Sequence, residues 1–174
     1  EAEKKIDSFE KESGISLAPE QRNAVVTALS GGCMILTGGP VTGKTTTINC
    51  LLSLLTYDKG NIEIFGKKMS PTNYEVKKNI GVITQNVAVF DELTVYENID
   101  YFCGLYVTDK NLRKQYVKEA IEFVGLENYT KFYPKKLSGG LLRRLNIACG
   151  IAHKPKLIIL DEPTVAVDPQ SRNK

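Results

Sequence analysis

The chain of 174 residues is 42% hydrophobic and 25% charged, with 14 glycines and 7 prolines, which is ordinary for one globular domain. It has no apolar run near the roughly 18 residues of a membrane span, and its first residues lack the basic and apolar segments of a secretory signal. Collagen-like, disordered, membrane-inserted and small secreted proteins are therefore excluded, and a net charge of +3 does not by itself indicate nucleic-acid binding.

The elements expected along the chain alternate between helices and strands. In chain order they are helices over 1–12 and 19–29, a strand over 33–37, a helix over 44–55, a half-buried strand over 61–65, a short helix from 70, a strand over 80–84, helices over 94–106, 112–124 and 140–153, and a strand over 157–160. This alternation predicts a three-layer α/β fold with a mostly parallel sheet.

Several of these boundaries carry local signals. Thr94 and Glu97 have the spacing of a capping box, which starts a helix, and Gly125 is placed to end the helix over 112–124. Pro155 stops the last helix. The run Leu157–Leu160 is continuously apolar, which is typical of a strand covered on both faces.

The cysteines and the basic residues bear on environment and ligands. The four cysteines, Cys33, Cys50, Cys103 and Cys149, form no C-x-x-C pair, so neither a zinc site nor a disulfide framework is predicted, and we expect a reducing, cytoplasmic setting. No acid lies between Glu127 and Asp161, a stretch that is either a solvated basic face or a surface that meets an anion such as a triphosphate. Its basic residues are Lys131, Lys135, Lys136, Arg143, Arg144, Lys154 and Lys156.

A P-loop motif stands between an expected strand and an expected helix. Gly38–Thr45 matches G-x-x-x-x-G-K-[ST]. In such a loop backbone N–H groups point at phosphate oxygens, Lys44 reaches the β- and γ-phosphates, and the Thr45 hydroxyl holds Mg²⁺. The residues expected to contact the nucleotide are Gly38, Gly39, Pro40, Val41, Thr42, Gly43, Lys44, Thr45 and Thr46.

Two further segments extend this chemistry. Asp161 and Glu162 follow an apolar strand, at the sheet end where ligands bind, so Asp161 would hold Mg²⁺ through water and Glu162 would act as a general base. Ser138, Gly139 and Gly140 precede a helix and form a second potential anion cradle, although Ser-Gly-Gly is also common in loops.

Together these residues resemble the nucleotide-binding domain of ABC transporters, over about 51–174. The resemblance implies that Gln85 is the Q-loop glutamine, which senses Mg²⁺ and couples to a membrane domain. It also implies that Leu137–Gly140 is the signature motif, which binds the ATP of an opposite subunit, and that Val165–Asp168 is the D-loop. Asp161 and Glu162 align with the Walker B aspartate and the catalytic glutamate. A small helical insertion is expected over about 88–153.

The first 47 residues instead resemble a RecD-like helicase, the DNA-unwinding subunit type of exodeoxyribonuclease V. The resemblance rests on Leu17–Val25 and on the P-loop segment Ile35–Thr47, and it implies that Gln21 contacts adenine. ABC domains stack adenine on an upstream aromatic residue, and Phe9 is the only aromatic residue before Lys44. The chain is therefore interpreted as a chimera joined within or just after the P-loop. An ABC domain with an unusual N-terminus is the alternative.

The sequence departs from both patterns. Val41 stands where both families usually have glycine, and a β-branched residue is costly if that position needs a positive φ. Two milder departures are Leu141, in place of the glutamine that often follows Ser-Gly-Gly, and Ala166, in place of the usual D-loop glycine. The ABC resemblance implies a further strand and a switch histidine after Lys174, and His153, the one histidine, is expected to be a helix-capping charge instead.

We therefore expect helicase-like helices over 1–32 and an ABC-like P-loop domain over 33–174. This domain is expected to bind ATP and Mg²⁺, with Lys44, Gln85 and Glu162 as its catalytic set and with hydrolysis weak or absent. Two alternatives are a RecD-like helicase fragment and an engineered chimera without activity. The resemblance implies a second nucleotide-binding domain, in a head-to-tail dimer, and a transmembrane domain as partners. Self-association is a further possibility, and nucleic acid is not expected.

Overall fold

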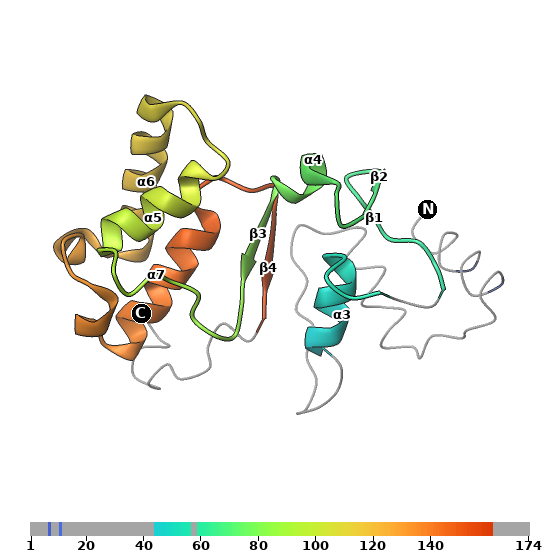
Figure 1. Cartoon of the computed structure of the whole chain (residues 1–174), viewed down its shortest axis with the longest axis horizontal. Coiled ribbons are helices and arrows are strands. Elements are labelled where there is room, and N and C mark those ends of the chain that lie inside the picture. Colours follow the sequence, from blue (N-terminus) through green and yellow to red (C-terminus); the bar gives the residue numbers. More distant parts are fainter. Residues whose placement is uncertain (1–6, 8–10, 12–43, 57–58, 162–174) are drawn as a thin grey trace. The chain divides into compact units, whose positions relative to one another are not determined.

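The computed structural model describes residues 7, 11, 44–56 and 59–161, and Figure 1 shows its helices and strands. The chain divides into two compact units, Glu1–Pro71 and Thr72–Lys174. The elements expected before residue 38 lie outside the described residues, apart from Asp7 and Lys11, which are helical and exposed. Within 44–56 and 59–161, no helix combines the length and the apolar character that a bilayer crossing requires.

In the first unit, helix α3 covers Lys44–Leu51 and is shorter than the predicted 44–55. It ends early because Ser53 adopts a positive φ of 52°. The N–H of Ser53 donates to the Cys50 carbonyl (3.0 Å) and that of Leu54 to the Asn49 carbonyl (2.8 Å), the two bonds of a Schellman motif. A serine in place of the usual glycine at this position hid the stop from sequence reasoning.

The strand predicted over 61–65 is the first arm of a hairpin. Strand β1 covers Glu63–Ile64 and pairs antiparallel with β2, Lys67–Lys68, with Glu63 opposite Lys68. Phe65 (φ 55°) and Gly66 (φ 69°) both take positive φ, as a type I′ turn requires. The prediction of a strand is therefore confirmed only at its end, and the returning arm was missed because phenylalanine rarely adopts this conformation.

In the second unit, two strands form a parallel pair. Strand β3 covers Ile80–Ile83 and β4 covers Leu157–Leu160, with Ile80 opposite Leu157 and Ile83 opposite Leu160. This pair agrees with the predicted strands over 80–84 and 157–160 and with their parallel arrangement. The prediction that the last strand is covered on both faces is wrong for its alternate residues, because Ile158 and Leu160 are 46% and 49% exposed.

The helices of this unit begin and end where capping chemistry dictates. Helix α4, Tyr74–Lys77, starts later than the predicted residue 70, because the Asn73 side chain caps it by accepting from the Val76 N–H. Helix α5, Val95–Gly104, has the predicted capping box between Thr94 and Glu97. Helix α6, Lys110–Val124, ends as predicted at Gly125, whose φ is 67°. Helix α7 covers Gly139–Ile151, and two short 3₁₀ helices cover Glu127–Tyr129 and Pro134–Lys136.

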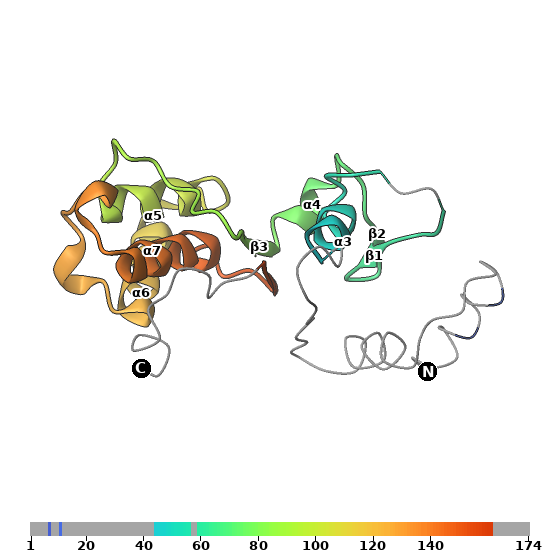
Figure 2. The ribbon, with the colours of Figure 1, turned by 90° about the horizontal axis from the view of Figure 1, so that it is seen from below.

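Helices α5, α6 and α7 pack on one another around a shared apolar core (Figures 1 and 2). Each helix contributes buried residues to it. The members are Val95, Ile99, Cys103, Val117, Ala120, Ile121, Leu126, Leu145, Ala148, Cys149 and Ala152. Helix α7 also contacts β3, so it joins the helical cluster to the parallel pair of strands.

The buried thiols of this core support a labelling prediction. Burial raises the pKa of Cys103 to about 11 and that of Cys149 to about 12, so neither forms much of the reactive thiolate near neutral pH. At pH 8 we expect Cys50, which is partly exposed, to react with iodoacetamide much faster than either. Peptide mass mapping after timed labelling measures the three rates, and the denatured chain, where all should react alike, is the control. Equal rates in the folded chain would contradict this burial.

Candidate functional site

The first helical turn of α3 presents the end of the P-loop motif. Lys44 opens this helix, and the Thr45 and Thr46 side chains are exposed on its first turn. No acidic residue lies in that turn, so the positive end of the helix dipole is not offset there by a side chain of the helix itself. This N-terminus suits an anion. Gln21, Gly38, Gly39, Pro40, Val41, Thr42, Gly43 and Glu162 lie outside the described residues.

In the second unit, Gln85 and Asp161 leave the same edge of the parallel pair. Gln85 comes two residues after β3, and Asp161 comes directly after β4. The Asp161 N–H donates to the Ile83 carbonyl at 2.9 Å, which continues the ladder one step beyond the strands. Asp161 is 8% exposed and Gln85 is exposed. The structure thus brings these two predicted Mg²⁺ residues to the carboxyl edge, where ligands of parallel sheets bind.

Two polar residues of α7 hold the segment 84–88, which contains Gln85. Arg143 Nη1 donates to the carbonyl oxygens of Thr84 (2.7 Å) and Gln85 (3.0 Å). Asn146 Nδ2 lies 3.4 Å from the Thr84 carbonyl oxygen, and its Oδ1 accepts from the Ala88 N–H at 3.1 Å. Both side chains are buried, and burial lowers the pKa of Arg143, although arginine stays charged in proteins.

Sequence reasoning missed this role for both residues. Arg143 was grouped with the basic stretch, and Asn146 was not singled out. The available signal was their spacing, three residues apart on one helix, which places both on one face.

Ser138 caps α7. Its Oγ accepts from the Leu141 N–H at 3.3 Å. Ser138 and Gly139 are exposed, Gly140 is half-buried, and no acidic residue lies in the first turn of α7. The predicted second anion cradle therefore has an accessible helix N-terminus.

The lysines of the basic stretch are exposed, as a solvated basic face requires, whereas Arg143 is buried, and the interpretation as a surface that meets an anion stays a prediction. Arg143 is buried against the segment 84–88. Lys135 lies 3.7 Å from Asp91, and Lys154 pairs with Glu119 while lying 4.3 Å from the Tyr116 ring centroid. Arg143, Lys135 and Lys154 therefore each interact with a different group of the second unit.

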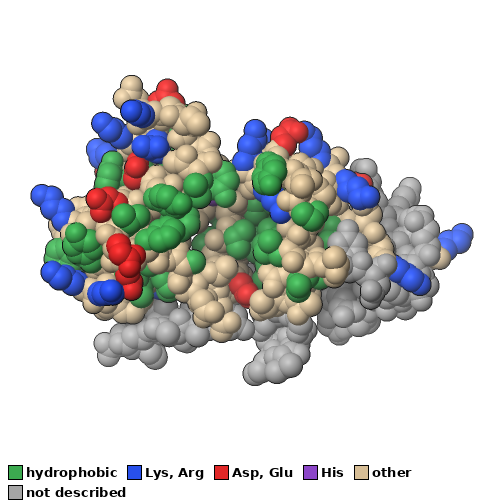
Figure 3. Space-filling model, viewed as in Figure 1, with side chains coloured by type: hydrophobic (Ala, Val, Ile, Leu, Met, Phe, Trp, Pro, Cys, Tyr) green, Lys and Arg blue, Asp and Glu red, His purple; other side chains and the backbone are tan. Residues whose placement is uncertain are grey.

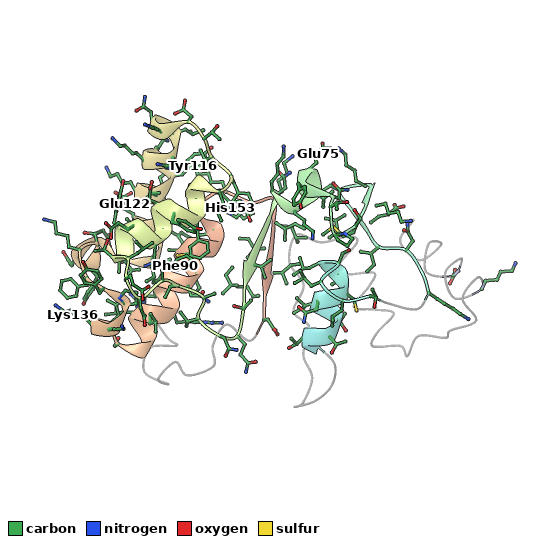
Figure 4. All side chains as sticks on the ribbon, viewed as in Figure 1. Glu75, Phe90, Tyr116, Glu122, Lys136 and His153 are labelled. Carbon is green, nitrogen blue, oxygen red and sulfur yellow. The ribbon has the colours of Figure 1, made fainter. Side chains whose placement is uncertain are left out.

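The prediction that His153 is a helix-capping charge is wrong. His153 lies just after the end of α7 (Figure 4). Its ring stacks on that of Tyr106, with centroids 4.2 Å apart. Burial lowers the pKa of His153, and a contact with the Ile80 backbone offsets only part of that effect. The imidazole is therefore neutral at pH 7 and packs as an aromatic ring.

An aromatic cluster next to the segment 84–88 was also missed. Phe90 contacts Tyr101 and Phe102 of α5, with ring centroids 5.0 and 5.8 Å away. Phe90 and Tyr101 are 43% and 47% exposed, and Figure 3 shows hydrophobic side chains gathered over α5 on this unit. Buried Asn98 holds the backbone of Phe90 from both sides, as acceptor from its N–H and donor to its carbonyl.

The P-loop motif that runs into α3 and the acid after a parallel strand are features of P-loop nucleotide-binding α/β proteins. The family model described as ABC transporter matches residues 21–165, and the chain belongs to this family. The matched span contains the P-loop, Gln85, the Ser138–Gly140 segment, Asp161 and Glu162.

Curated relatives agree with this membership. The linearmycin resistance ATP-binding protein LnrL of Bacillus subtilis is 39% identical over 131 residues, which are 75% of this chain and 42% of that protein. The methionine import ATP-binding protein MetN of Clostridium tetani is 34% identical over 74% of this chain and 42% of its own length. The sulfate/thiosulfate import ATP-binding protein CysA of Mesostigma viride is 36% identical over 96% of this chain and 47% of its own. The chain thus spans less than half the length of each.

These matches give no support to a helicase-like segment or to a chimera. The ABC family model begins at residue 21 and runs through the P-loop, the region that had suggested RecD. The relationship to CysA extends over 96% of the chain. The ABC family model therefore covers the P-loop region that had suggested a helicase. The strand–P-loop–helix unit occurs in both ABC domains and RecD-like helicases, so its motif alone does not separate the two families.

Proposed function

We propose that this chain binds Mg²⁺-ATP as the ATP-binding domain of an ABC-type transporter. The observation that supports this most directly is the placement of Gln85 and Asp161 at one carboxyl edge of the β3–β4 pair. Family membership supplies the expectation of ATP. The oxygen atoms of Asp161, Gln85 and Thr45 are the ligand type that Mg²⁺ prefers, so the residues fit this ion.

Each predicted residue then has a distinct task. The backbone of Gly38–Gly43 and the N-terminus of α3 bind the phosphates, and Lys44 adds a charged donor to their β- and γ-oxygens. Thr45, Gln85 and Asp161 would hold Mg²⁺, which would supply neutralisation of charge on the phosphates. Glu162 accepts a proton from the attacking water as general base.

The partners follow from the family. The Ser138–Gly140 segment at the N-terminus of α7 is proposed to contact ATP held by a second nucleotide-binding domain. A transmembrane domain is proposed to carry the substrate path, with this domain on its cytoplasmic side. Relatives named for methionine import, sulfate import and linearmycin resistance share the domain, so we propose that the membrane partner selects the substrate.

Replacing Lys44 with alanine tests ATP binding. Losing a charged hydrogen-bond donor to phosphate is expected to cost about 1.5–3 kcal/mol, or roughly 10- to 150-fold in Kd. Isothermal titration with ATP and Mg²⁺ measures this. Lys114→Ala, which removes an exposed lysine of α6, is the matched control and should leave the Kd unchanged. Equal affinities in the Lys44→Ala and unmodified chains would refute the proposed site.

Replacing Val41 with glycine is expected to tighten ATP binding. If the P-loop needs a positive φ at this position, the β-branched side chain costs about 1–3 kcal/mol, which glycine would recover. Val41→Ala keeps the Cβ and should give little of the gain, so the two variants separate backbone freedom from side-chain size. The same titration provides the comparison, and a Val41→Gly affinity no better than that of the unmodified chain would contradict this explanation.

A further inference from the structure

Arg143 and Asn146 bracket Gln85 from a different element. They come from α7, nearly 60 residues away in sequence, yet they bond the backbone at Thr84, Gln85 and Ala88. The bonded groups lie before, at and after Gln85. The backbone of this residue is therefore held on both sides, while its own side chain stays exposed.

This arrangement does more than fill space. Arg143 is 4% exposed, and its guanidinium reaches two successive carbonyl oxygens, as a charged donor that neutral residues of the same size cannot replace. Thr84 Oγ1 donates to the Asn86 carbonyl at 2.6 Å, which tightens the turn that presents Gln85. Buried, hydrogen-bonded groups of this kind keep one backbone conformation, because releasing any of them would leave buried polar atoms unpaired.

We propose that Arg143 and Asn146 are positioning residues for Gln85, and that they latch the segment 84–88 to α7. The proposal rests on the proposed function of Gln85 as an Mg²⁺ contact. Ser138 caps the same helix, so the segment predicted to meet a partner's ATP and the latch on Gln85 share one rigid element. In this role Arg143 and Asn146 do not contact the nucleotide themselves. They determine the position of the Gln85 side-chain oxygen by holding its backbone.

The affinity for ATP, measured with Mg²⁺ and again with EDTA, tests this role. In Arg143→Met the Mg²⁺-dependent gain in affinity should fall about tenfold or more, as for other residues that orient metal ligands, while the affinity in EDTA stays unchanged. Arg143→Lys, which keeps one charged donor, should restore part of the gain. The matched control is Arg144→Met, because Arg144 contacts the Val124 carbonyl of α6 instead, and it should keep the full gain.

The outcomes distinguish positioning from general damage. Full retention of the Mg²⁺-dependent gain in Arg143→Met would overturn the latch, and so would an equal loss of affinity with and without Mg²⁺. If Arg143→Met fails to fold, Asn146→Ala carries the same test, because it removes only neutral hydrogen bonds. If the unmodified chain binds no ATP, the proposed function is refuted instead. The latch between α7 and the segment 84–88 is then tested by a second measurement.

That second readout needs no nucleotide. The chain has no tryptophan, so Val87→Trp places one fluorophore in the latched segment, at a residue that is 37% exposed. Adding Arg143→Met or Asn146→Ala to this background should lower the tryptophan anisotropy, and adding Arg144→Met should not. Unchanged anisotropy in both latch variants would overturn the proposal, whatever the ATP titration shows.

Discussion

Replacing Gly81 with alanine is expected to lower the free energy of unfolding of the second unit by about 3 kcal/mol, at the upper end for overpacking a core. Gly81 lies in β3, where α7 crosses the strand. A Cβ on Gly81 would press against the Gly150 carbonyl oxygen and lie 2.8 Å from Pro155 Cγ. Gly150 is equally tight, since its Cβ would lie 2.8 Å from Ile83 Cγ1. Backbone and ring atoms cannot move aside without separating α7 from β3.

Urea unfolding followed by far-UV circular dichroism measures this change. Gly104→Ala is the matched control, because a Cβ there meets only the end of the Arg113 side chain, 2.9 Å from Nη1. That side chain can shift, and alanine favours the helix by about 1 kcal/mol, so the control should be neutral or stabilising. A Gly81→Ala chain as stable as the unmodified one would show that α7 does not approach β3 this closely.

Replacing Asn98 with leucine is expected to cost about 2 kcal/mol or more and to release the turn before α5. The Asn98 side chain is fully buried and donates to the carbonyl oxygens of Phe90, Leu93 and Thr94, each at 3.0 Å. Its Oδ1 also accepts from the Phe90 N–H at 2.8 Å. Leucine has a similar size and none of these bonds, so the backbone groups of the turn would lose their partners.

Two measurements check this expectation. Urea unfolding gives the loss of stability, and near-UV circular dichroism reports whether Phe90 leaves the rings of Tyr101 and Phe102. Asn128→Leu, at an exposed position, is the control and should change neither. If Asn98→Leu keeps both the stability and the aromatic signal of the unmodified chain, the turn does not depend on this side chain.

The parts of the second unit that sequence patterns predicted best are those with short-range causes. The capping box at Thr94, the stop at Gly125 and the parallel strands around 80–83 and 157–160 all appear in the structure. The caps of α5 and α6 depend on contacts between residues a few positions apart, and the two strands are continuous apolar runs. In the first unit, the element ends that were missed at Ser53 and Phe65 involve positive φ in residues that rarely adopt it.

The candidate site divides in the same way. The motif spacing around Lys44, Gln85, Ser138 and Asp161 was sufficient to indicate an ABC-type domain, because a P-loop and its accompanying motifs are ordered along the chain. The family match agrees with that indication. The comparisons give no support to the helicase-like interpretation of the first 47 residues, and the strand–P-loop–helix unit on which it partly rested occurs in more than one family.

The sequence by itself indicated the family, the start of α5 at its capping box and the end of α6 at Gly125, since these depend on local motifs and caps. Only the tertiary structure decided that Arg143 and Asn146 hold the segment around Gln85, that His153 is a neutral stacked ring, and that Gly81 admits no side chain. The physical reason is distance along the chain. Burial and hydrogen bonds between groups nearly 60 residues apart arise from packing, which no local pattern encodes.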